Sequence, residues 1–209
     1  MEAFIHEKQE NSKRPELWVF LGRVILAEGE GADLKAASTA FVTATMYIQD
    51  YGPAVLGQIE VQARLGNLAM AISLGDRYLQ QHERDVDVLF RVATLLAYDP
   101  ARYPEAQDRV TKAIAVEERP DFIRFRGYVL TQLGRFDEAI ADMGHVIQIG
   151  GPPTGDDELT LAEAYLGKKD LTAAREHLAN AEKLITKDDE RLMLRLKQLQ
   201  EKSNTGGTN

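Results

Sequence analysis

Histidines and acidic residues are the side chains of this sequence that could support acid–base or metal chemistry. No histidine pair has the spacing of a helical metal site such as HExxH, so the histidines read as isolated surface residues. Three consecutive acids, Asp156, Asp157 and Glu158, precede an expected helix, where a cap and the helix dipole explain them without a metal. We therefore expect no catalytic and no metal-binding residues. The histidines are His6, His82, His145 and His177.

Phosphate-binding and thiol chemistry are not indicated either. The segment "GEG" (residues 29–31) does not follow an expected strand, so it is read as a loop insertion and not as a dinucleotide-binding turn. The chain has no Cys, which excludes disulfides, thiolate catalysis and Cys-ligated zinc. We expect a protein that is not an enzyme, that needs no cofactors, and that acts through its surface.

Composition narrows the kind of partner. The chain of 209 residues is 44% hydrophobic and 28% charged, enough to bury a core and keep a charged surface. Its formal net charge of −8 argues against general nucleic-acid binding, which relies on clustered Lys and Arg. No apolar run is long enough for membrane insertion, and residues 1–18 do not resemble a signal peptide, so we expect a cytoplasmic protein.

A short pattern that closes on an alanine recurs along the chain. It is clearest in "GRFDEA" (residues 134–139) and returns in "GNLAMA", "ARYPEA", "KDLTAA" and "ADLKAA". Apolar or small residues lie three before, four after and seven after each alanine, as on the buried face of a helix. The period of about 34 residues is the length of one helix–turn–helix unit. The repeat alanines are Ala37, Ala71, Ala106, Ala139 and Ala174.

A second helix is expected upstream of each turn. In the fourth unit, Ile123, Gly127 and Leu130 recur at helical spacing. A small residue in the middle of such a stripe lets two helix backbones approach closely, and a larger one would overpack the crossing.

This pattern resembles the tetratricopeptide repeat. The first unit carries Trp18, Leu21 and Gly22 at the family's spacing, and the fourth carries Gly127 with "LGRFDEAI". The resemblance covers about residues 15–186 and implies an all-α fold, a right-handed α-solenoid of about five helix–turn–helix units. The expected units are 15–51, 52–86, 87–119, 120–154 and 155–186.

The ends and one turn depart from the regular pattern. About three extra residues near 27–32 predict a longer loop in the first unit. Residues 187–202 predict an amphipathic helix that starts at Asp188 or Asp189 and covers the last unit with Leu192, Leu196 and Leu199. Residues 203–209 are expected to be a disordered tail, and residues 1–14 either a short helix or a disordered segment.

The resemblance also implies a binding surface, because the first helices of such units line a concave groove. Counting from the repeat alanines places Arg91, Arg124 and two tyrosines in its middle, with Leu95 between them. Arginine pairs would favour an acidic or C-terminal carboxylate ligand. The alternative is that these arginines pair with acids of neighbouring helices. The groove candidates are Arg23, Glu60, Arg91, Leu95, Tyr98, Arg124, Tyr128 and Glu163.

Three functional hypotheses follow from this surface. The leading one is a non-enzymatic adaptor that binds a protein or peptide segment in the groove. The second, by family analogy alone, is a cytosolic chaperone or assembly factor of a bacterial secretion system. The third is a scaffold that acts by self-association through the edge of the first unit or the terminal leucine stripe. The Lys and Asn clamp of family members that hold chaperone tails is not reproduced, which disfavours a co-chaperone.

Overall fold

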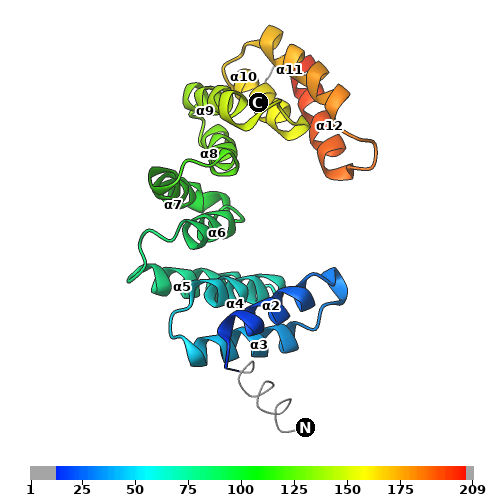
Figure 1. Cartoon of the computed structure of the whole chain (residues 1–209). Coiled ribbons are helices and arrows are strands. Elements are labelled where there is room, and N and C mark those ends of the chain that lie inside the picture. The colour runs from blue at the N-terminus through cyan, green and yellow to red at the C-terminus, as the bar shows by residue number, and fades with distance from the viewer. Residues whose placement is uncertain (1–12, 206–209) are drawn as a thin grey trace. The chain divides into compact units, whose positions relative to one another are not determined.

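The computed structural model describes residues 13–205, and all regular elements in that range are helical (Figure 1). This confirms the all-α prediction. The chain divides into two compact units between Leu96 and Ala97. We call residues 13–96 the N-terminal unit and residues 97–205 the C-terminal unit. Within residues 13–205, no helix is long and apolar enough to cross a membrane. Most of the predicted N-terminal segment and the last residues of the predicted tail lie outside the described range.

The N-terminal unit consists of helices that pack in chain order. Proline at the first turn starts two of them, and Asp33 caps a third by accepting a hydrogen bond from the backbone N–H of Ala36. The expected long loop of the first unit is confirmed, since residues 27–33 connect the first two helices and include a 3-10 turn. The elements are α2 (Pro15–Leu26), η1 (Gly29–Gly31), α3 (Leu34–Tyr47), α4 (Gly52–Arg64), α5 (Leu68–Leu79) and α6 (Val86–Leu96).

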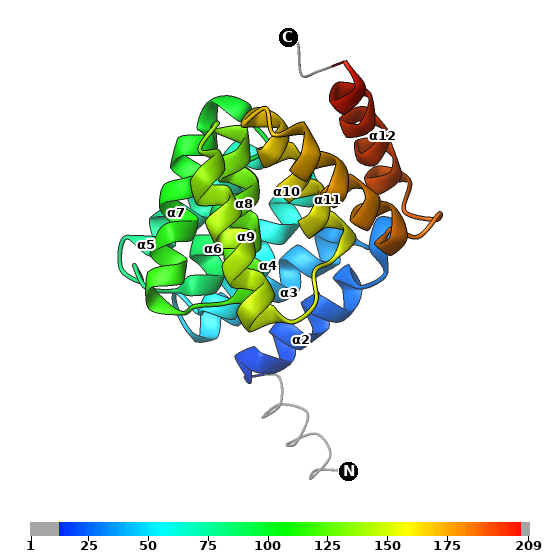
Figure 2. The ribbon, with the colours of Figure 1, turned by 90° about the horizontal axis from the view of Figure 1, so that it is seen from above.

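The C-terminal unit continues the same helix–turn–helix order. Figure 2 shows it from above, with α12 at its C-terminal edge. The unit boundary falls inside the third expected repeat, because α6 packs on α4 and α5, whereas α7 packs on α8. The elements are η2 (Pro100–Arg102), α7 (Tyr103–Val116), α8 (Pro120–Gln132), α9 (Phe136–Gly150), α10 (Gly155–Gly167), α11 (Leu171–Leu184) and α12 (Glu190–Asn204).

The repeat alanines lie where the sequence pattern predicts them. All five are fully buried, and the residues four positions later are buried as well. A methyl group is the largest side chain that these helix crossings accommodate without moving the backbones apart. The repeated alanines therefore mark equivalent packing positions, which confirms that the period of about 34 residues is a structural repeat.

Small residues on the first helix of a repeat face large residues on the second. The ring of Phe41 lies between Gly22 of α2 and Gly57 of α4, and a Cβ atom at these glycines would lie 2.6 Å and 2.2 Å from it. In the C-terminal unit, Gly127 makes the same kind of contact with Met143, at 2.8 Å. Phe41 is fully buried between two glycines, so glycine is a steric requirement of that crossing, whereas the flexible Met143 side chain would have to shift to admit a Cβ at Gly127.

In the second, fourth and fifth repeats the turn before the second helix contains a left-handed residue, whereas the third repeat turns at Asp99 and Pro100 without one. Gly66 and Gly134 have φ angles of 78° and 73°, which glycine adopts without a steric penalty. In the fifth repeat Lys169 takes this place with a φ of 62°. The positive φ angle therefore explains why position 134 is a glycine, as expected for the start of the α8–α9 hairpin turn.

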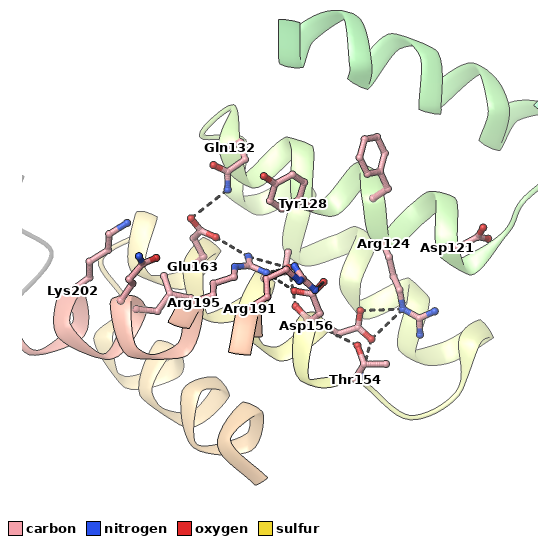
Figure 3. Close-up of a pocket in the computed structure, with 15 residues that line it drawn as sticks. Asp121, Arg124, Tyr128, Gln132, Thr154, Asp156, Glu163, Arg191, Arg195 and Lys202 are labelled. Atoms are coloured by element: carbon pink, nitrogen blue, oxygen red, sulfur yellow. Dashed lines mark hydrogen bonds and ion pairs between the residues drawn. The ribbon is translucent and has the colours of Figure 1, made fainter. Parts of the chain in front are cut away.

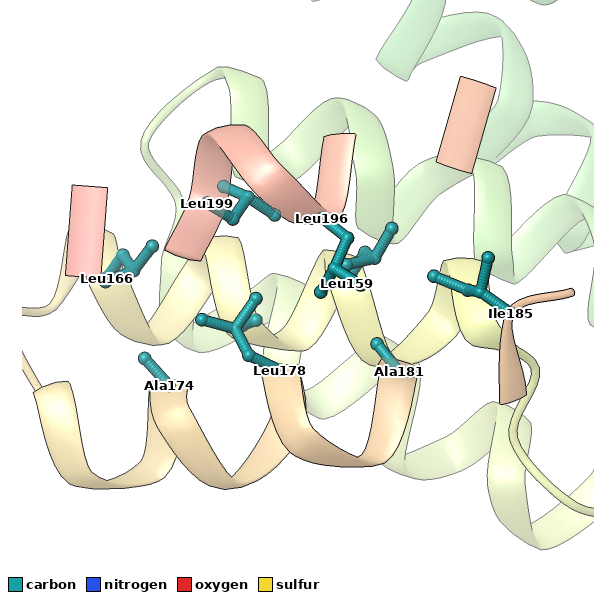
Figure 4. Close-up of a cluster of buried hydrophobic side chains, with 9 residues drawn as sticks. Leu159, Leu166, Ala174, Leu178, Ala181, Ile185, Leu196 and Leu199 are labelled. Carbon is teal, nitrogen blue, oxygen red and sulfur yellow. The ribbon is translucent and has the colours of Figure 1, made fainter. Parts of the chain in front are cut away.

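Helix α12 covers the apolar side of the last hairpin. Leu196 and Leu199 are buried against Leu159 of α10 and Leu178 of α11 (Figure 4). Asp189 caps the helix by accepting from the backbone N–H of Leu192. The helix extends past the predicted end at residue 202 to Asn204, and Arg175 donates from Nε to the Ser203 hydroxyl at 3.2 Å.

Candidate functional site

The groove candidates are distributed over both compact units. Four belong to the N-terminal unit and four to the C-terminal unit, so each set is described within its own unit. The N-terminal set is Arg23, Glu60, Arg91 and Leu95, and the C-terminal set is Tyr98, Arg124, Tyr128 and Glu163.

In the N-terminal unit the candidates form an ion-pair cluster. Glu60 of α4 accepts from Arg64 and from Arg91 of α6, each at 2.7 Å. Leu95 is only 2% exposed, so its side chain belongs to the interior and not to an open surface. Arg23 is exposed and forms no ion pair within the described range. Arg91 is therefore neutralised by its neighbour, as in the alternative that we considered from the sequence.

The C-terminal unit contains a cavity of about 560 Å³ between α8, α10 and α12. We call it the C-terminal cavity (Figure 3). Its walls are polar and charged, with an aromatic floor from α8. It brings together Arg124, Tyr128 and Glu163 of the predicted set, whereas Tyr98 does not line it. The lining residues are Asp121, Arg124, Phe125, Tyr128, Gln132, Thr154, Asp156, Asp157, Thr160, Glu163, Arg191, Arg195, Gln198, Leu199 and Lys202.

One wall is fixed by the start of α10. Thr154 and Asp157 form a reciprocal capping box, in which each side chain accepts from the other residue's backbone N–H. Arg124 of α8 donates from Nε to both carboxylate oxygens of Asp157, at 3.0 and 3.1 Å. The Asp157 side chain is 3% exposed. The capping role predicted for these acids is confirmed at Asp157, which also joins α8 to α10.

The opposite wall comes from α12. Arg195 donates to Asp156 at 2.7 Å and to Glu163 at 2.8 Å, and its guanidinium lies over the Tyr128 ring. Gln132 of α8 donates to the same Glu163 at 3.3 Å. These bonds join α8, α10 and α12 into one polar network, so the cavity has a defined shape without a ligand.

The predicted groove did not include α12, so one wall of the site was missed. The four α12 polar residues of the cavity recur at helical spacing, which puts them on one face. The signal was present, because Tyr128, Glu163 and Arg195 follow one another at nearly the repeat period. Helix α12 thus contributes to this surface as a first helix of a further repeat would. The α12 residues are Arg191, Arg195, Gln198 and Lys202.

The Tyr128 phenol, which belongs to the aromatic floor, is favoured in its neutral form. Burial, followed by a hydrogen bond with Tyr103, raises the pKa of the Tyr128 phenol to about 12. The rings of these two tyrosines meet edge to face at 6.4 Å. At physiological pH, Tyr128 therefore offers an apolar face and a neutral hydroxyl, and not a charge.

Charge in the cavity is balanced overall but unevenly paired. Arg124 and Arg195 are both held by carboxylates at hydrogen-bond distance. Arg191, in contrast, is 71% exposed and lies 3.6 Å from Asp156, and Lys202 is exposed with no ion pair among residues 13–205. Lys202 lies at one end of the lining residues and Asp121 at the other (Figure 3). The cations available to a ligand are therefore Arg191 and Lys202 of α12.

The described histidines are in structural contacts. His177 contacts the buried Glu158 through Nδ1 at 2.7 Å and stacks on Tyr165, and His145 contacts Glu118. His82 stacks on Tyr78. His6 lies outside the described range. Across residues 13–205 no group of three or more His, Asp or Glu side chains is arranged to hold a metal ion.

Comparison with solved structures identifies the fold as that of tetratricopeptide-repeat proteins. YrrB, described as a tetratricopeptide-repeat protein with an unusual peptide-binding site, is 19% identical with a TM-score of 0.69, covering 94% of this chain and 98% of its own. TTC0263 of Thermus thermophilus is 21% identical with a TM-score of 0.64, covering 88% and 98%. PilF of Pseudomonas aeruginosa is 17% identical with a TM-score of 0.72, covering 96% and 89%. No family model and no curated protein matches the sequence.

Proposed function

We propose that this protein is a non-enzymatic interaction module that binds an extended peptide segment in the C-terminal cavity. The observation that carries the proposal is a preformed polar cavity, lined by three helices, whose own ion pairs hold it open. Gln198 and Tyr128 offer hydrogen-bonding groups to a peptide backbone. The similarity to YrrB, which has a peptide-binding site, supports the same proposal.

The ligand that fits best ends in, or contains, a carboxylate. Arg191 and Lys202 are the exposed cations of the cavity, and they lie on one face of α12. Arg191 and Lys202 lie about 16 Å apart along the helix, so each would bind a different carboxylate of an extended peptide. Such contacts would gain charge-assisted hydrogen bonds without breaking the pairs that hold Arg124 and Arg195. This moves the acidic specificity that we predicted from the sequence away from Arg91 and Arg124 and onto α12.

A displayed random-peptide library tests this function. Panning on the full chain should select peptides rich in Asp and Glu or with a free C-terminal carboxylate. Titration calorimetry of a selected peptide should show about tenfold weaker binding to R191E/K202E, from the loss of roughly 1.4 kcal/mol. Lys197→Glu reverses one exposed charge of α12 outside the cavity and should bind as the wild type does. Equal binding to all three proteins, or no selection, would reject the proposal.

The hypothesis of a secretion chaperone or assembly factor stays a prediction from family analogy. The scaffold hypothesis has a specific structural observation in its favour, which lies in the N-terminal unit.

A further inference from the structure

Helix α2 carries an apolar stripe on its outer face. The four side chains recur at i, i+3, i+4 and i+7, so they lie on one side of the helix. They are between 40% and 66% exposed, while Val19, Gly22 and Leu26 on the other side are buried. We call these four residues the α2 stripe: Leu17, Phe20, Leu21 and Val24.

The same repeat positions are buried in later first helices. Leu17 and Val24 correspond by the repeat phase to Ala54 and Val61 of α4, which are at most 1% exposed. Inner first helices therefore bury these positions. Among the helices of residues 13–205, α2 packs mainly on α3 and α4 (Figure 1). Within that range its outer face has the apolar residues of an inner helix but lacks the neighbouring helix that would cover them. A contiguous apolar face of this kind marks an interaction surface.

The charged residues next to the α2 stripe indicate which kind of helix would pack on it. Glu16 and Arg23 lie two turns apart on the same flank, one near each end of α2. Both are exposed, and neither forms an ion pair within the described range. In an antiparallel pair of identical helices related by a two-fold axis, equal flanks meet. Glu16 of each copy then lies beside Arg23 of the other. A parallel pair would place them against the flank of Trp18 and Ile25.

We propose that the α2 stripe binds the α2 stripe of a second copy of this chain, antiparallel, with two reciprocal ion pairs between Glu16 and Arg23. One helix per copy gives a smaller interface than a standard stable complex, so the dimer is concentration-dependent, with a dissociation constant on the order of 10–100 µM. This inference does not depend on peptide binding, because it uses only the N-terminal unit.

Sedimentation equilibrium of the full chain over a range of concentrations tests the dimer. The wild type should associate, whereas Phe20→Glu should remain monomeric because it would bury a charge at the centre of the interface. Met46→Glu is the matched control, since Met46 is an exposed apolar residue of α3 outside the stripe. Circular dichroism checks that each variant is folded.

A charge swap tests the antiparallel register. Arg23→Glu sets carboxylates against one another in both pairs and should weaken association by about tenfold or more. The double variant E16R/R23E recreates both pairs with reversed polarity, and its dissociation constant should return to within about threefold of the wild type. A structural role of Arg23 within one chain would not be restored by this exchange.

Three results would overturn the proposal. The first is a wild-type mass of one chain at concentrations well above the expected dissociation constant. The second is a double variant as weak as Arg23→Glu. The third is a sharp fall in melting temperature from the wild type to Phe20→Glu at concentrations where both are monomeric, which would mean that the stripe is covered within the same chain.

Discussion

Helices α2 and α12 both carry an apolar stripe, but only one of the stripes is covered. Leu196 and Leu199 of α12 pack on α10 and α11, and its polar side enters an ion-pair network through Arg195. The α2 stripe is exposed, and the charges next to it are unpaired within the described range. The same helical periodicity therefore gives a buried apolar face on α12, which we call the closed edge, and an exposed apolar face on α2, which we call the open edge.

This difference separates two ways of interacting. The C-terminal unit has a polar cavity bounded by ion pairs, which suits a ligand that offers hydrogen bonds and charge. The N-terminal unit has a flat apolar helix face, which suits another helix. Whether an amphipathic helix closes its unit or opens it to a partner is decided by its neighbours, and not by its own pattern.

The largest expected effect compares one leucine of the closed edge with one phenylalanine of the open edge. Leu196→Ala should lower the free energy of unfolding by about 2–5 kcal/mol, because the buried side chain leaves a cavity. Phe20→Ala should change it by less than about 0.5 kcal/mol at concentrations where the chain is monomeric. Urea denaturation measures both, and equal losses would contradict the distinction between the edges.

Overpacking a repeat alanine should have the next largest effect. Ala139→Leu inserts three carbons at a fully buried helix crossing and should cost about 1–3 kcal/mol of stability. Gly144 of the same helix has no neighbouring atom near an added Cβ, so Gly144→Ala should instead stabilise by roughly 0.4–1 kcal/mol. An unchanged melting temperature in Ala139→Leu would count against the repeat register.

Loss of the Asp157 charge should loosen the wall of the cavity. Asp157→Asn weakens the capping box and leaves Arg124 without its carboxylate, which should cost about 1–2 kcal/mol. Asp121→Asn alters an exposed carboxylate paired with Arg119 and should stay within about 0.5 kcal/mol. Thermal unfolding of the two variants distinguishes them, and similar shifts would show that the network does not hold α10 in place.

The smallest effect concerns alkaline pH. The pKa of the Tyr128 phenol is raised from 10.0 to about 12 in the folded chain. Its neutral form is therefore favoured by folding, and this contribution is complete below pH 10 and lost as the pH rises toward 12. The wild type should lose more stability in this window than Tyr128→Phe. Parallel losses in the two proteins, measured by urea denaturation, would place Tyr128 in a solvent-like environment.

The fold could be predicted from sequence because its signals are local and repeated. Each alanine, turn glycine and cap acts within one hairpin, and five copies in phase reinforce each other. The cavity could not be predicted, because it depends on ion pairs between helices, such as Arg124 with Asp157 and Arg195 with Glu163. Partner choice among several acids is set by side-chain geometry in the folded chain, which residue spacing does not determine.

One groove expectation was wrong and one wall of the site was not foreseen. Leu95 was placed on an open groove but is buried, and α12 was not part of the predicted groove but lines the cavity. In both cases the helix itself was predicted, but the neighbours that its faces meet were not. The boundary between Leu96 and Ala97 also has no composition signal in the sequence, since it follows from α6 and α7 packing on different partners.

Hydrogen–deuterium exchange tests the central claim most directly, namely that the C-terminal cavity binds the ligand and the N-terminal unit does not. The full chain is compared with and without a peptide selected by panning. Slower exchange should appear in α8, α10 and α12 and be clearly reduced in R191E/K202E at a peptide concentration near the wild-type dissociation constant, while α2 and α4 should exchange as in the free protein. Protection that appears in α4 and α6, with none in α12, would contradict the account.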